Sequence, residues 1–133
     1  MKITANDFFG AFFCALRLDS GAVQYECGER FNEAVQSAFD KFRELCTKEG
    51  FIPTFRILLD PLHGDSGTIE SGLLSGIRSD FIGLENPDFV KFRLKVTPDE
   101  AKELLEILPG KPDIYRAVVK EFLAEYNRET TRV

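Results

Sequence analysis

Residues 29–48 carry the strongest folding signal in this chain, an apolar stripe with the period of an α-helix. Lys48 lies in the last predicted turn and Gly50 follows it, as helix C-termini prefer. Such a stripe must be buried, so the rest of the domain has to be built against it. We predict a long amphipathic helix whose buried face comprises Phe31, Ala34, Val35, Ala38, Phe39, Phe42, Leu45 and Cys46.

Length and composition indicate one globular domain. The 133 residues are 44% hydrophobic and 29% charged, which is a typical balance for a folded domain of this size. The chain has 13 Phe and no Trp. This bias predicts a phenylalanine-packed core, with an apolar surface patch for a partner as the alternative. We expect a single domain over residues 1–133, with a polar tail from residue 127 that frays.

The N-terminal quarter allows two interpretations. Residues 12–18 and 22–27 both alternate between the two sides of a strand, and Gly21 lies in the turn between them. This pattern favours a β-hairpin. The competing prediction is a helix over residues 5–17. Thr4 would cap it, together with the carboxylate of Asp7 three residues later.

The remaining pattern completes an α+β fold. Strand-like segments at 51–59, 77–84 and 89–96 predict an antiparallel meander of about three strands. Thr97 begins a helix to about residue 108, and another begins near Pro112. We therefore expect a hairpin, a long helix, the meander and two C-terminal helices. Whether the strands form one sheet stays open.

The loop at residues 60–68 is the strongest candidate for chemistry. It contains the only histidine, His63, near Asp60, Asp65 and Ser66, a set from which a small hydrolase could draw a general base and its orienting carboxylate. The competing interpretation is that these groups only shape a turn. No complete catalytic set is present, and we predict that the loop is not catalytic.

This loop allows two other interpretations. Residues 64–67 read Gly-Asp-Ser-Gly, as around the nucleophile of trypsin-like serine proteases. Those enzymes need a histidine and an aspartate from distant segments of a larger two-barrel fold, so we reject this assignment. If residues 68–77 form a helix, its first N–H groups could bind an anion, although no lysine adjoins them. Such a helix would place Ile69, Leu73, Leu74 and Ile77 on one face.

A basic stripe is the second candidate site. Lys91, Arg93 and Lys95 share one face of the segment 89–96, on which they could contact single-stranded nucleic acid or another anion. An ordinary solvated strand face is the more common arrangement. The net charge of -5 is spread evenly along the chain, which argues against nucleic-acid binding as the main function.

Metal, redox and membrane functions find no support in the sequence. The three cysteines, Cys14, Cys27 and Cys46, lie on apolar faces and are expected to be reduced thiols in a cytoplasmic protein. One histidine and no cysteine pair exclude a common zinc site, and we expect no metal or cofactor. The apolar run 8–16 is too short for a membrane span and lacks the flanks of a signal peptide.

These observations favour a non-enzymatic interaction module. We expect a small cytoplasmic adaptor, regulator or immunity-type inhibitor that binds a protein partner, with a homodimer as one arrangement. A hydrolase built on the 60–68 loop is the alternative, and a single-stranded nucleic-acid-binding module is the second alternative.

Overall fold

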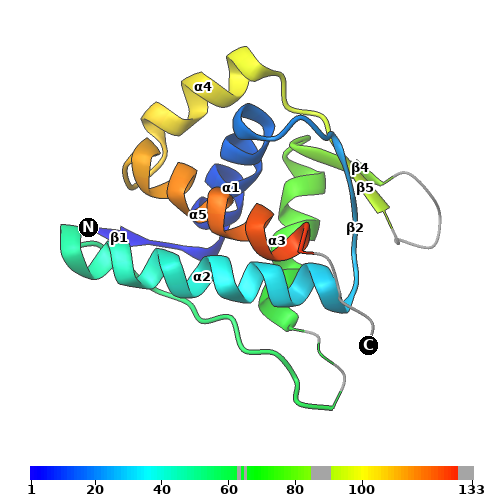
Figure 1. Cartoon of the computed structure of the whole chain (residues 1–133). Coiled ribbons are helices and arrows are strands. Elements are labelled where there is room, and N and C mark those ends of the chain that lie inside the picture. Colours follow the sequence, from blue (N-terminus) through cyan, green and yellow to red (C-terminus); the bar gives the residue numbers. More distant parts are fainter. Residues whose placement is uncertain (63, 65, 85–90, 129–133) are drawn as a thin grey trace.

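A computed structural model describes residues 1–62, 64, 66–84 and 91–128 of the chain. Its mixed, helix-dominated architecture confirms the α+β class (Figure 1). The described helices are α1 (Ala5–Asp19), α2 (Glu29–Glu49), α3 (Gly67–Arg78), α4 (Pro98–Ile107) and α5 (Pro112–Tyr126). The strands are β1 (Lys2–Ile3), β2 (Gln24–Glu26), β3 (Ile52–Pro53), β4 (Ile82–Leu84) and β5 (Lys91–Leu94).

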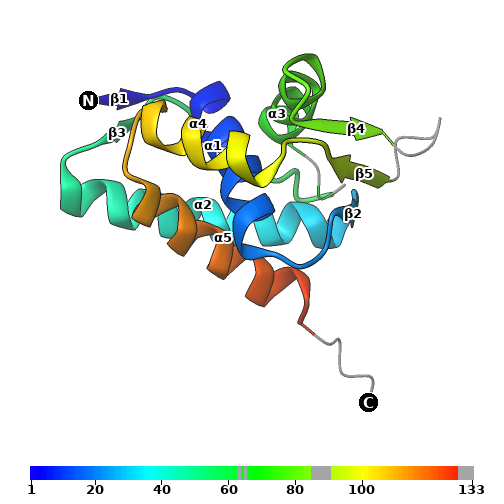
Figure 2. The same cartoon turned by 90° about the horizontal axis from the view of Figure 1, so that it is seen from above.

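Helix α1 forms the centre of the molecule. Every residue from Phe8 to Leu16 is buried, and a helix that is apolar on all sides must be surrounded by other elements. Helices α3, α4 and α5 contact it, and Figures 1 and 2 show these helices around it. The apolar run 8–16 is thus the innermost helix of the domain.

The predicted N-terminal hairpin is wrong, and the competing helix is confirmed. Residues 12–18 belong to α1, and of the segment 22–27 only β2 is a strand. Thr4 caps the helix, because its Oγ1 accepts from the Asp7 N–H (3.2 Å) while the Asp7 carboxylate accepts from the Thr4 N–H (3.2 Å). In a run where nearly every residue is apolar, alternation cannot distinguish a strand from a buried helix.

Helix α2 agrees with the prediction. The predicted apolar stripe is buried, except that Leu45 is partly buried. Gly50 closes the helix in the left-handed conformation, with a φ of 79°. Helix α2 lies against α5, so the stripe is covered by a helix from the other end of the sequence (Figure 2).

The strands form two sheets rather than one predicted meander. A three-stranded antiparallel sheet has the order β2-β5-β4, and β1 pairs in parallel with β3. Of the segment 51–59 only β3 is a strand, and it lies outside the antiparallel sheet, where β2 provides the third strand. Ile77 belongs to α3, so the predicted strand 77–84 shortens to β4. Of the predicted strand 89–96, residues 89 and 90 lie outside the described part, β5 covers residues 91–94, and residues 95 and 96 follow the strand.

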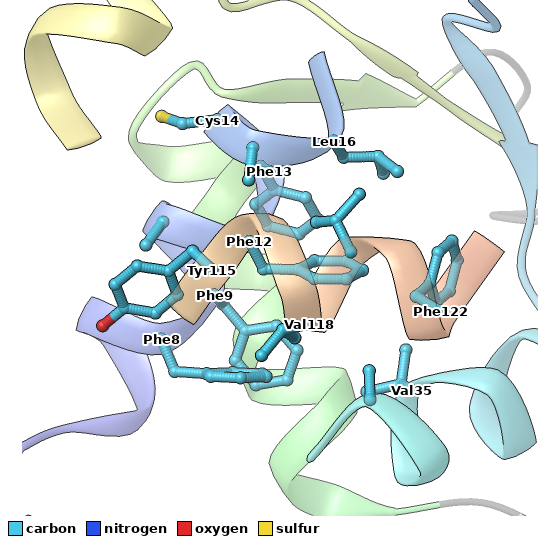
Figure 3. Close-up of a cluster of buried hydrophobic side chains, with 14 of the residues drawn as sticks. Phe8, Phe9, Phe12, Phe13, Cys14, Leu16, Val35, Tyr115, Val118 and Phe122 are labelled. Carbon is cyan, nitrogen blue, oxygen red and sulfur yellow. The ribbon is translucent and has the colours of Figure 1, made fainter. Parts of the chain in front are cut away.

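Phenylalanine rings connect the elements of the core, as the composition predicts. Phe8 of α1 contacts Phe42 of α2, with ring centroids 4.8 Å apart. Phe12 of α1 meets Phe122 of α5 edge-to-face at 5.0 Å. Figure 3 shows the α1 rings pointing in several directions from one helix. The described phenylalanines are either buried or packed against this core.

Two glycines allow α3 to lie directly on α1. A Cβ on Gly72 would lie 2.4 Å from Cδ2 of Phe9, and a Cβ on Gly76 would lie 2.6 Å from Cε2 of Phe13. Gly72 and Gly76 are four residues apart on α3, and Phe9 and Phe13 are four residues apart on α1. Each ring therefore rests on a glycine of the facing helix. This close crossing determines where the outer face of α3 lies.

The two C-terminal helices follow the prediction. Thr97 caps α4, since its Oγ1 accepts from the Glu100 N–H (3.2 Å) and its own N–H donates to the Glu100 carboxylate (3.0 Å). Helix α5 begins at Pro112. Of the tail predicted to fray, Asn127 and Arg128 follow α5, and residues 129–133 lie outside the described part.

Candidate functional site

An apolar groove lies between α3 and the antiparallel sheet, near the beginning of α2. It has a volume of about 480 Å³. Helix α3 contributes Leu73, Leu74 and Ile77, and the sheet contributes Ile82 and Leu84. Its remaining lining residues are Cys27, Gly28, Asn32, Ile69, Glu70 and Phe92.

The groove follows from how α3 and the sheet are built. Gly72 and Gly76 are buried against α1, so the neighbouring stripe of α3 faces outward along the groove. Leu74 is 48% exposed and Leu84 is 37% exposed, one on each wall. Exposed leucines that line a shared concave surface are typical of an interaction site rather than of scattered surface residues.

The described residues of the 60–68 loop form a structured turn. Ser66 is 5% exposed, and its Oγ accepts from the Ile69 N–H (3.4 Å), so it caps α3. The Asp60 carboxylate accepts from the Leu62 N–H (2.7 Å). The Asn32 side chain donates to the Gly64 carbonyl (2.9 Å), which ties the turn to α2. The hydroxyl of Ser66 and the carboxylate of Asp60 therefore have structural roles.

His63 and Asp65, the other two candidate catalytic residues, lie outside the described residues. The hydrolase alternative therefore stays a prediction. It would be tested by screening the wild type and a His63→Ala variant for hydrolysis of ester and amide substrates.

Helix α3 does form after this loop, as the anion-binding interpretation requires. A surface depression of about 550 Å³ includes Gly67 and Thr68 of α3, Ala5 and Asn6 of α1, and Arg56. Arg56, which is exposed, places a cation near the start of α3, although no lysine or arginine adjoins that helix start in the sequence. It comes from the segment after β3, and only the tertiary fold brings it to the start of α3.

The basic stripe lies on one face of the sheet, as its alternation indicates. Lys91, Arg93 and Lys95 are exposed, whereas the intervening residues of β5 are buried. Lys91 Nζ lies 4.0 Å from the Glu26 carboxylate, and Lys95 Nζ lies 3.2 Å from Oδ1 of Asp80. These acidic neighbours lower the positive potential of the stripe.

The cysteines are free thiols, and their surroundings keep them protonated. Burial raises the pKa of Cys14 to about 12 and that of Cys46 to about 11. Burial also raises the pKa of Cys27. Since the thiolate is the nucleophile, none of the three is activated at neutral pH. Among the residues that the structure describes, no group of three or more histidine, cysteine or acidic side chains could hold a metal ion.

No family model, curated protein or solved structure matches this chain. Within the described ranges, none of the helices combines the length and hydropathy needed to cross a bilayer.

Proposed function

We propose that this protein is a non-enzymatic interaction module that binds a partner protein through the apolar groove between α3 and β4. The observation that supports this proposal best is the exposure of Leu74 and Leu84 on opposite walls of that groove. Burying such residues against a partner removes apolar surface from water, which contributes roughly 25 cal/mol per Å².

The surroundings of the groove favour a protein partner over a small polar ligand. Glu70 is the one charged residue among the groove's lining residues in the described part of the chain. Apolar side chains of a partner therefore suit the walls better than a charged metabolite does. An adaptor, a regulator and an immunity-type inhibitor in the cytoplasm would all use such a surface, and the reduced thiols suit that compartment.

The Leu74→Glu variant tests this function. We expect it to lose binding of the natural partner by at least about tenfold, since a carboxylate would be buried against an apolar surface. The matched control is Ile107→Glu, because Ile107 is 77% exposed on α4 and is not among the lining residues of the groove. Proteins of the native host that bind to the wild type and to the control, but not to the Leu74→Glu variant, are the candidate partners. Calorimetry with each purified candidate then measures affinity, and equal affinity for all three proteins would reject the proposal.

A second candidate function, single-stranded nucleic-acid binding, is favoured by the shared face of Lys91, Arg93 and Lys95. Because acidic groups neighbour two of them, we expect no retention of a labelled single-stranded RNA or DNA 20-mer at low salt. Replacing all three by glutamine should change the free energy of unfolding by less than about 1 kcal/mol. Salt-sensitive binding by the wild type that the triple variant loses would instead make nucleic-acid binding the leading function.

A further inference from the structure

We draw no further inference here: the strongest candidate, the surface depression where the first turns of α1 and α3 meet near Arg56, consists of helix N-termini and one exposed cation, and among the described residues no buried polar side chain without a partner points to an anionic ligand there.

Discussion

Replacing Phe8 with alanine should lower the free energy of unfolding by about 3–5 kcal/mol. The Phe8 ring is fully buried and lies within 4.8 Å of the Phe42 ring and 5.4 Å of the Phe55 ring, between centroids. Removing it would leave a cavity where α1, α2 and the segment after β3 meet. Urea unfolding followed by circular dichroism measures the change.

The matched control for that prediction is Phe51→Ala. Phe51 is only partly buried and packs at the margin of the core, so its truncation should cost clearly less. A loss below about 1 kcal/mol for Phe8→Ala, or equal losses for the two variants, would show that α1 is not the central helix.

Gly72→Ala should destabilise the protein by about 1–3 kcal/mol, even though alanine favours helix by about 1 kcal/mol over glycine. The reason is steric, because the new Cβ would lie 2.4 Å from a ring carbon of Phe9. Either the ring must leave its position or α3 must move away from α1. Movement of α3 would also displace the wall that carries Leu74, so binding at the groove should weaken as well.

Gly67→Ala is the control for this substitution, since a Cβ there would meet no atom within 4 Å. It lies in the same helix and should leave the free energy of unfolding within about 1 kcal/mol of the wild type. Shortening the facing ring in the double variant Gly72→Ala with Phe9→Leu should restore part of the loss, as expected for residues in contact. If Gly72→Ala proved as stable as Gly67→Ala, the close crossing of α1 and α3 would be wrong.

The helices predicted correctly are those whose sequence has both a helical repeat of apolar residues and a residue pattern that marks where the helix begins or ends. Helix α2 has a separated apolar stripe and Gly50, and α4 has the Thr97 capping box. For α1 the Thr4 cap was visible, but nine consecutive buried residues gave no polar face to set the period. The strands were shortened or reassigned because pairing partners depend on tertiary structure, as with β2 against β5.

The candidate site was visible in the sequence only as separate parts. A shared face of Leu73, Leu74 and Ile77 could be expected if α3 formed. The position of this face opposite Leu84 could not be predicted from the sequence. It depends on the glycines that bring α3 onto α1 and on the order of strands in the sheet. Likewise, the sequence left Ser66 as either a candidate catalytic residue or a turn-forming residue, and only the structure shows that its hydroxyl caps α3.

The central position of α1 has a consequence for synthesis of the chain. Its native neighbours α3, α4 and α5 all follow it in sequence, and Phe12 meets Phe122 only after α5 has been made. At about 5–20 residues per second, the ribosome needs on the order of 10 seconds to make the roughly one hundred intervening residues. During that time the most apolar helix of the domain lacks the elements that bury it in the native structure. The nascent chain should therefore depend on chaperones that bind apolar segments early in translation.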